Sequence, residues 1–153
     1  MEIDKISQFI KDVSAQDILP RFRNLKEHEV IIKEPGEFVT EADLAAEISL
    51  IRKLSSLYPT SIISGEEELV KSPEKLAELI ASPLGFLIDP IDGTNNFIKG
   101  NERFAVMVVA LQYGVTAASW IYQPYTDKMA VAEKGSGAFV NDEKITLAAP
   151  PEN

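Results

Sequence analysis

Two aspartates, Asp89 and Asp92, follow directly on an apolar run in the stretch LIDPIDGTNNF, residues 87–97. Pro90 lies between them, and because proline has a fixed φ and no N–H we expect a stiff turn that holds the two carboxylates close together. Carboxylates that lie close together repel each other unless one is protonated or a cation lies between them. Their oxygens, with the main-chain carbonyl of Ile91, are hard ligands of the kind that Mg²⁺ takes. The stretch therefore predicts a divalent-metal site.

The residues that follow can bind a phosphate beside such a metal. Gly93 has no Cβ, so its backbone can approach a ligand closely. If a helix begins at 94–96, its free N–H groups favour a phosphate, and the hydroxyl of Thr94 can orient a water. This combination predicts metal-assisted hydrolysis of a phosphate ester. Asp-Pro and Asp-Gly are also common turn dipeptides, so a plain acidic turn is the alternative.

Two further acidic positions can contribute to the same site. The run GEEE at 65–68 follows a short strand candidate at 61–64, so Glu66 or a neighbour is a candidate metal ligand; a solvated loop is the alternative. Asp43 lies three residues after Thr40, a spacing close to that of a capping box at a helix start. Asp43 can therefore be a first-turn cap residue, or it can hydrogen-bond Thr94 if that helix points into the site.

The elements that must position these residues follow from periodicity. Apolar spacing predicts helices over 3–13 and from Thr40 to about 58, the second with a buried face of Leu44, Ile48, Ile51 and Leu54. A third helix is expected after Ser72-Pro73, and a short buried strand at 86–88 is expected to end at Asp89. Runs rich in β-branched and aromatic residues predict strands over 104–114, 115–124 and 128–133, with a hairpin turn at Gly114. Helices followed by a strand meander predict an α+β fold with helices packed on an antiparallel sheet.

Composition bounds the class of protein. The chain has 153 residues, of which 45% are hydrophobic and 25% charged, as expected for one globular domain. A formal net charge of −9 disfavours nucleic acid and anionic membranes as partners. There is no cysteine, no signal-peptide pattern and no apolar stretch of about 18 residues that could span a membrane, so we expect a cytoplasmic protein.

Four segments together resemble the inositol monophosphatase family, in the lithium-sensitive, magnesium-dependent sugar phosphatase superfamily. DPIDGTNNF at 89–97 is similar to the family signature D-P-[IL]-D-G-T-x-x-F, and GEE at 65–67 to its upstream metal motif. VTEAD at 39–43 resembles the family's V-T-x-x-D helix start, and GSGAFVND at 135–142 its G-x-G-A-[FW]-x-N hairpin. The order of the segments agrees with the family over nearly the whole chain.

The resemblance implies a ligand set for Mg²⁺. Glu66, Asp89 and the carbonyl of Ile91 would bind a first ion, and Asp89 and Asp92 would share a second. Glu66 would also help to hold a third ion. Lys33 would neutralise part of this acidic cluster.

The resemblance also implies a mechanism and partners. Thr94 and Asp43 would be catalytic and would orient the water that attacks phosphorus, without a phosphoenzyme. The amides of Gly93 and Thr94 would hold phosphate oxygens. The implied substrate is a small phosphorylated metabolite such as inositol 1-phosphate. The sheet face that the second half of a family member covers would be apolar and exposed in this chain, so we expect a homodimer. A 3′-phosphoadenosine phosphate or sugar-bisphosphate phosphatase shares these motifs and is the alternative.

In one respect the chain differs from the family pattern. The family continues into a second region with a W-D-x-A-A-G motif, whose aspartate completes the second metal site, whereas Trp120 is followed here by Ile121. The resemblance therefore implies one domain over 1–153, the N-terminal metal-binding half of the sugar-phosphatase α/β sandwich, with the C-terminal region missing. It also implies weakened binding of the second metal and impaired turnover, so a catalytically silent fragment with a partial metal site is a further alternative.

Overall fold

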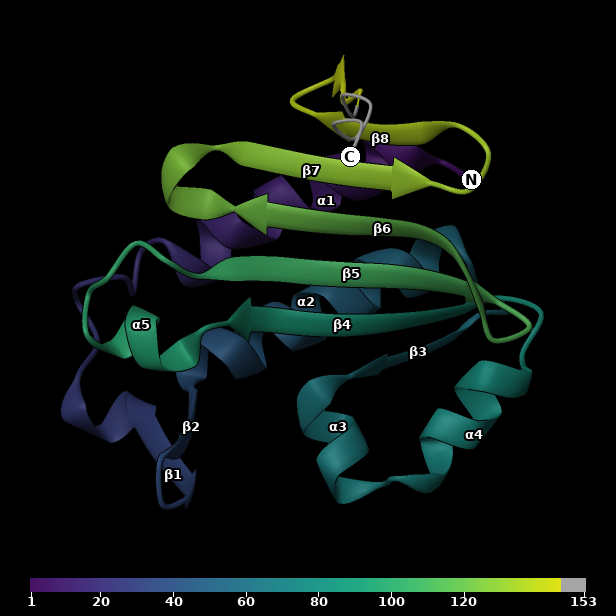
Figure 1. The fold of residues 1–153 in the computed structure, drawn as a ribbon. Helices are drawn as coiled ribbons and strands as arrows, with labels where there is room; N and C mark the ends of the chain where they lie inside the picture. Colours follow the sequence, from purple (N-terminus) through teal and green to yellow (C-terminus); the bar gives the residue numbers. More distant parts are fainter. Residues whose placement is uncertain (147–153) are drawn as a thin grey trace, which may run out of the picture.

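A seven-stranded sheet organises the structure, a computed structural model that describes residues 1–146 (Figure 1). Its strands lie side by side in chain order: β3 (Ile62–Gly65), β4 (Gly85–Asp92), β5 (Ala105–Gln112), β6 (Val115–Gln123), β7 (Lys128–Glu133), β8 (Gly137–Val140) and β9 (Glu143–Lys144). All neighbours are antiparallel except β3, which pairs in parallel with β4. The predicted α+β fold with helices on an antiparallel sheet is confirmed, with one parallel edge strand added.

The hairpin between β5 and β6 turns where the sequence predicts it. Tyr113 has φ 49° and Gly114 has φ +75°, so both loop residues are left-handed. A two-residue loop of this kind has the twist that matches antiparallel strands, and glycine adopts it at little cost. This turn sets the register between β5 and β6.

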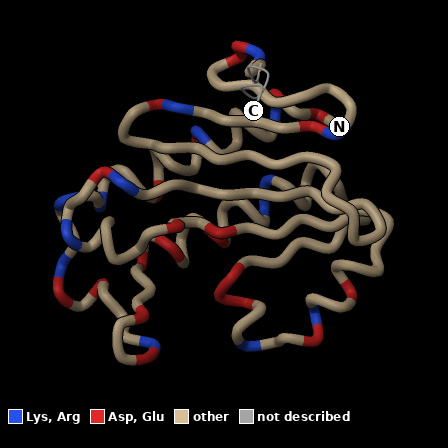
Figure 2. The backbone as a smooth tube through the Cα atoms, viewed as in Figure 1, with Lys and Arg blue, Asp and Glu red and all other residues tan. Residues whose placement is uncertain are grey.

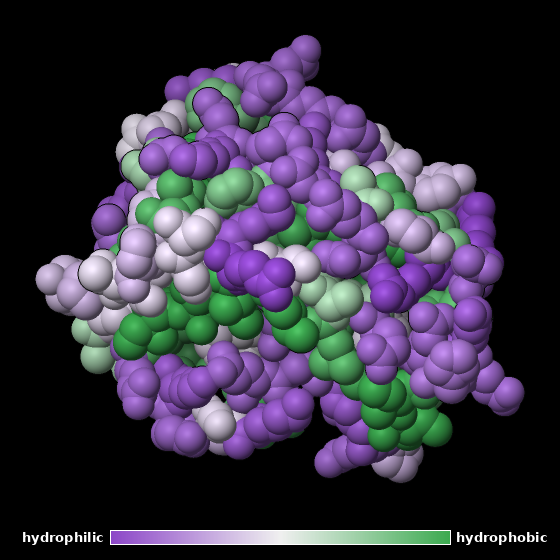
Figure 3. All heavy atoms as spheres, turned by 180° about the vertical axis from the view of Figure 1, so that it is seen from behind, coloured by the Kyte–Doolittle hydropathy of each residue, from purple (hydrophilic) through white to green (hydrophobic). Residues whose placement is uncertain are grey.

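Two helices cover one face of the sheet. α1 (Ile3–Val13) packs against β6 and α2 (Glu41–Leu57) against β4, and both lie behind the sheet in Figure 1. The core between helices and sheet includes the fully buried Trp120 and Phe86. Seen from behind, hydrophilic side chains occupy much of the surface over these helices (Figure 3), as expected for amphipathic helices with one buried face.

The buried face of α2 differs from the predicted one. Ile48 is 59% exposed, whereas Asp43 and Glu47 are 4% and 7% exposed. The predicted apolar row of Leu44, Ile48, Ile51 and Leu54 is therefore wrong in part, although Leu54 is fully buried. The helix is rotated so that two carboxylates face the interior, where burial is costly without partners.

Strand β4 carries the acids out of the core. Phe86 and Ile88 are buried against the helices, and Asp89 lies on the opposite face. The prediction that the strand ends at Asp89 is wrong, because β4 continues to Asp92. Asp89 pairs with Met107 and Asp92 with Ala105. Three steps on β4 thus match two on β5, which is a bulge, and Pro90 within it has no N–H for the ladder.

The hairpin of β1 (Val30–Glu34) and β2 (Glu37–Thr40) and the helices α3 (Glu66–Lys71) and α5 (Thr94–Ile98) lie near this end of β4 (Figure 1). Helix α4 (Glu74–Ala81) packs at the opposite end, where Leu79 lies against Gly85. The sheet face opposite α1 and α2 borders a largely apolar groove of about 610 Å³, lined by Leu87, Met107, Val109 and Ile121 together with Leu69 and Val70 of α3. Among the described residues, no helix is long and apolar enough to cross a membrane.

Candidate functional site

Asp89 lies at the centre of a group of acidic side chains. Figure 2 shows acidic segments at the end of β4 and at the start of α3 near one another. Burial raises the pKa of Asp89 to about 7, and the charges of nearby carboxylates add to the effect. These carboxylates are Glu66, Asp92 and Asp43. The buried Oδ1 of Asp89 has no hydrogen-bond partner within residues 1–146, so this oxygen is available to a cation.

Asp43 and Thr94 are brought together by α2 and α5. The N–H of Thr40 donates to Asp43 Oδ2 at 2.8 Å and the N–H of Asp43 donates to Thr40 Oγ1 at 3.4 Å, which together form the predicted capping box. The Thr40 hydroxyl also donates to Asp43 Oδ2. Thr94 Oγ1 lies 3.3 Å from Asp43 Oδ1 and 2.9 Å from the carbonyl oxygen of Ile91. Burial raises the pKa of Asp43, although the hydrogen bonds from Thr40 and Thr94 oppose that shift. Asp43 thus both caps its own helix and contacts Thr94; the catalytic role of the pair stays a prediction.

Gly93 allows the chain to turn sharply from β4 into α5. Its φ is +87° and its ψ 36°, a left-handed conformation that favours glycine. A Cβ at this position would lie 2.9 Å from the carbonyl oxygen of Arg103, so the space is also restricted. The predicted helix start at 94–96 is confirmed, because α5 begins at Thr94. Phosphate binding by the Gly93 and Thr94 amides stays a prediction.

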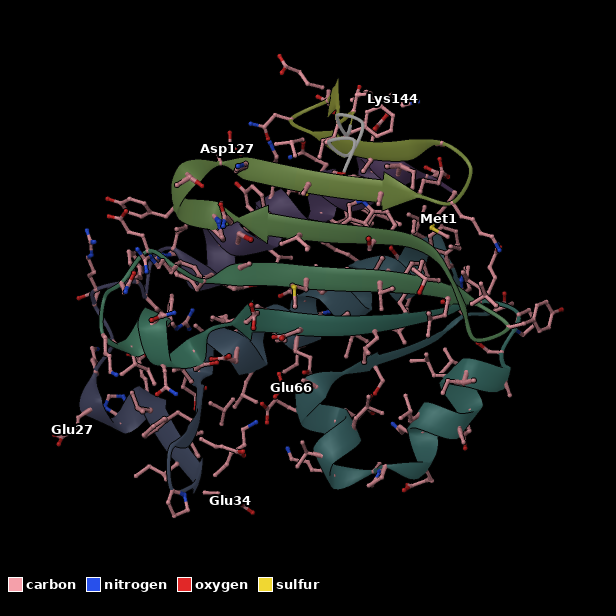
Figure 4. The ribbon with its side chains drawn as sticks, viewed as in Figure 1. Met1, Glu27, Glu34, Glu66, Asp127 and Lys144 are labelled. Atoms are coloured by element: carbon pink, nitrogen blue, oxygen red, sulfur yellow. The ribbon has the colours of Figure 1, made fainter. Side chains whose placement is uncertain are left out.

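Glu66 begins α3 and lies below the end of β4 (Figure 4). Its side chain is 52% exposed, and its Oε1 lies 3.7 Å from Nζ of Lys33, on β1. Lys33 also forms a close ion pair with the buried Glu67. Burial lowers the pKa of Lys33, but the hydrogen bond and charge of Glu67 and the charge of Glu66 outweigh it, and the net shift is upward. Lys33 therefore neutralises part of the acidic cluster, as predicted.

Glu67 is a buried member of the acidic cluster that the sequence did not distinguish from its neighbours in the run at 65–68. Only 8% of it is exposed. The ion pair with Lys33 joins positions 34 residues apart, on a hairpin and a short helix. The run of three glutamates does not by itself predict which side chain faces the interior. Because α3 begins at Glu66, the side chain of Glu67 is the one that faces inward.

The candidate ligands are of the chemical type that binds a divalent cation, but their side chains are not arranged around a common point. The unpartnered Asp89 oxygen and the Ile91 carbonyl are hard ligands of the right type. Within the described part of the chain, however, no three acidic, histidine or cysteine side chains are grouped so that they could hold a metal. Glu66 lies near Lys33 instead, and Asp92 is exposed.

Comparison of the chain with known proteins identifies its family. The family model described as "Inositol monophosphatase family" matches residues 2–153. The chain belongs to the inositol monophosphatase family. Members of this family are typically Mg²⁺-dependent phosphatases.

Curated relatives within the inositol monophosphatase family carry two kinds of name. The chain is 32% identical over 129 residues to the inositol-1-monophosphatase of Rhizobium meliloti, covering 84% of this chain and 46% of that protein. It is also 32% identical over 135 residues to the Nus factor SuhB of Vibrio cholerae, covering 88% of this chain and 48% of that protein. The chain thus spans about half the length of the curated relatives it matches.

Solved structures of family members share the fold. The extragenic suppressor protein suhB from Bartonella henselae superposes with a TM-score of 0.79 at 29% identity, over 97% of this chain and 55% of that one. The IMPase of Thermotoga maritima has a TM-score of 0.81 at 24% identity, over 97% and 54% of the two chains. The described fold is therefore about half of the inositol monophosphatase fold, as the sequence resemblance predicted.

Proposed function

We propose that this chain carries the metal-binding part of a Mg²⁺-dependent phosphatase of small phosphomonoesters. The observation that supports this most is the buried, unpartnered oxygen of Asp89 among other carboxylates. A carboxylate in such surroundings is destabilised when ionised unless a cation compensates its charge. Membership of a phosphatase family that is typically Mg²⁺-dependent agrees with it.

Four groups would hold the cation: the side chains of Glu66, Asp89 and Asp92 and the carbonyl oxygen of Ile91. Glu66 would have to turn away from Lys33, whose Nζ lies 3.7 Å from Glu66 Oε1. When bound, Mg²⁺ supplies a water of lowered pKa and neutralises charge on the phosphate. The protein side chains alone leave the site acidic, so the proposed function needs the cation to admit an anionic ester.

Thr94 and Asp43 would orient the attacking water and take its proton. The single hydrogen of the Thr94 hydroxyl faces the Ile91 carbonyl oxygen at 2.9 Å and Asp43 Oδ1 at 3.3 Å, and the hydroxyl oxygen can accept a hydrogen bond from water. Because burial raises the pKa of Asp43, its carboxylate is a better proton acceptor than an exposed one. The water oxygen then bonds to phosphorus, the ester P–O bond breaks, and the leaving alkoxide takes up a proton. The Gly93 and Thr94 amides would hold the phosphate oxygens.

The proposed substrate is an inositol-1-phosphate-like monoester, since the relatives from Rhizobium meliloti and Mesorhizobium japonicum are both named inositol-1-monophosphatase. A panel that includes 3′-phosphoadenosine phosphate and a sugar bisphosphate distinguishes the alternative specificities. The proposed assembly is a homodimer, which light scattering of the purified chain measures.

A catalytically silent domain that binds metal is the second candidate function. It is favoured by the exposed positions of Glu66 and Asp92. The two candidates share the metal site and differ in turnover. They are therefore separated by measuring binding and phosphate release on the same preparation.

The test combines calorimetric titration of Mg²⁺ or Mn²⁺ with an assay of phosphate release. Asp89→Asn keeps the shape of the side chain and removes its charge, and Asp142→Asn on an exposed turn is the matched control. We expect metal binding that is lost in Asp89→Asn and kept in Asp142→Asn. Release that is also lost in Asp89→Asn supports the phosphatase, and binding without release supports the silent domain. Equal binding by wild type and Asp89→Asn would contradict both.

A further inference from the structure

Glu47 is a buried carboxylate that the proposed chemistry does not use. It lies one turn after Asp43 on α2, and only 7% of it is exposed. Its Oε2 accepts a hydrogen bond from the N–H of Glu67 at 3.3 Å. Burial raises the pKa of Glu47, and the hydrogen bond from the Glu67 N–H opposes that shift. The negative charges of Glu67 and Glu68 raise the pKa further, and the positive charge of Lys71 lowers it. Burying a carboxylate costs free energy unless it is hydrogen-bonded. The hydrogen bond to the backbone of α3 therefore indicates that Glu47 has a role there.

Gly65 leaves the space that the Glu47 carboxylate occupies. A Cβ built on Gly65 would lie 2.0 Å from both Cδ and Oε2 of Glu47. The φ of Gly65 is −96°, which any residue can adopt, so glycine is not needed here for backbone conformation. The absence of a Cβ at Gly65 therefore allows the Glu47 side chain to approach the junction between β3 and α3 closely.

Through these contacts a single helix holds two sides of the site. One turn of α2, about 6 Å along its axis, separates Asp43 from Glu47. Asp43 contacts Thr94 at the start of α5, and Glu47 contacts the first turn of α3. Glu66 immediately precedes the residue that Glu47 holds, so the position of its backbone depends on that hydrogen bond.

We propose that Glu47 is a positioning residue, which fixes the first turn of α3 so that Glu66 can reach a cation bound at Asp89. This inference rests on the proposed function, since it assumes that Glu66 and Asp89 bind the same ion. Residues that orient metal ligands without touching the metal typically change affinity by about 10- to 100-fold when they are altered. Glu47 acts in this way through the backbone of α3.

The experiment measures Mn²⁺ affinity by calorimetry in Glu47→Ala, in Gly65→Ala and in the double variant. Glu47→Ala removes the acceptor, and Gly65→Ala displaces it by adding a methyl group where the carboxylate lies. We expect each single variant to bind Mn²⁺ about 10-fold more weakly than wild type. The double variant should bind Mn²⁺ no more weakly than Glu47→Ala alone. Without the Glu47 carboxylate, the methyl group that Gly65→Ala adds has room and displaces no side chain.

Two further variants separate positioning from stability. Glu47→Gln keeps the shape and an acceptor oxygen, so it should retain wild-type affinity for Mn²⁺. Leu54→Val removes one methylene from the core side of the same helix, and it should lower the melting temperature without changing the affinity.

Two negative outcomes have different meanings. If wild type binds Mn²⁺ and Glu47→Ala binds it equally well, the positioning role is wrong and the proposed function stands. If wild type binds no Mn²⁺, the proposed function fails and this inference fails with it. A loss of affinity in Leu54→Val equal to that in Glu47→Ala would also overturn the positioning role, because it would show an effect of stability alone.

Discussion

At the scale of single residues, Asp89 shows a conflict between stability and function. Its side chain is half-buried beside other carboxylates, so the ionised form is unfavourable in the metal-free chain. A residue chosen only for stability at this position would be uncharged. The carboxylate is useful only if a cation takes up its unpartnered oxygen.

Asp89→Asn is therefore expected to stabilise the metal-free chain at neutral to alkaline pH. One pKa unit corresponds to about 1.4 kcal/mol, but solvent near this half-buried group reduces the effect, and we expect a gain of about 1 kcal/mol. Urea unfolding in the presence of a chelator measures it, with Asp142→Asn as the control. Lower stability of Asp89→Asn under these conditions would show that the carboxylate is well accommodated without a cation.

The pH dependence of stability follows from the same residue. The pKa of Asp89 is about 7 in the folded chain and near 3.8 in the unfolded chain. Between these values the folded chain binds a proton that the unfolded chain has lost, so the contribution of Asp89 to stability falls as pH rises from about 4 to about 7.

Mg²⁺ is expected to reverse this trend, because a cation binds the deprotonated carboxylate. The rise in melting temperature on adding Mg²⁺ should be larger at pH 8 than at pH 5.5. Thermal unfolding with and without Mg²⁺ at both pH values measures the difference, which Asp89→Asn should abolish. An equal effect of Mg²⁺ at the two pH values would place the ion elsewhere.

At the scale of elements, α2 links the stability of the fold to the site. Its capping box was predictable from Thr40 and Asp43, because N-cap chemistry is local in sequence. Its buried face was not fully predictable, since Asp43 and Glu47 take inward positions that apolar periodicity assigns to residues such as Ile48. The departure from the apolar pattern lies where the helix meets the proposed site.

Thr40→Ala should destabilise the chain by about 1 kcal/mol, because it removes the hydroxyl that caps α2 and donates to Asp43. Thr40→Ser keeps that hydroxyl and is the matched control. Urea unfolding compares the two variants with wild type. Equal destabilisation by alanine and serine would mean that the lost methyl group, rather than the cap, is responsible.

Contacts between distant segments limited what the sequence could predict. The parallel pairing of β3 with β4 and the bulge at Asp89–Asp92 depend on which strands meet in space. The contact between Lys33 and Glu67 likewise joins a hairpin to a helix. By contrast, the strand meander, the turn at Gly114 and the helix start at Thr94 follow from local sequence and are confirmed.

At the scale of the whole molecule, the described chain forms one sheet with helices over one face and the acidic site at one end of β4 (Figures 1 and 2). The fold superposes on about half of the suhB protein from Bartonella henselae and of the Thermotoga maritima IMPase. The sheet therefore positions Asp89. Helix α2 packs against β4 and contacts Thr94 and α3 through its side chains. These three connections define the site on which the proposed function depends.

The most direct measurement is the anomalous diffraction of a crystal of this chain soaked in Mn²⁺. We predict a peak about 2.1 Å from an oxygen of Asp89, with Glu66 turned away from Lys33 and the Ile91 carbonyl within ligand distance. Well-ordered Asp89 and Glu66 side chains that remain apart, with no anomalous peak between them, would contradict the account.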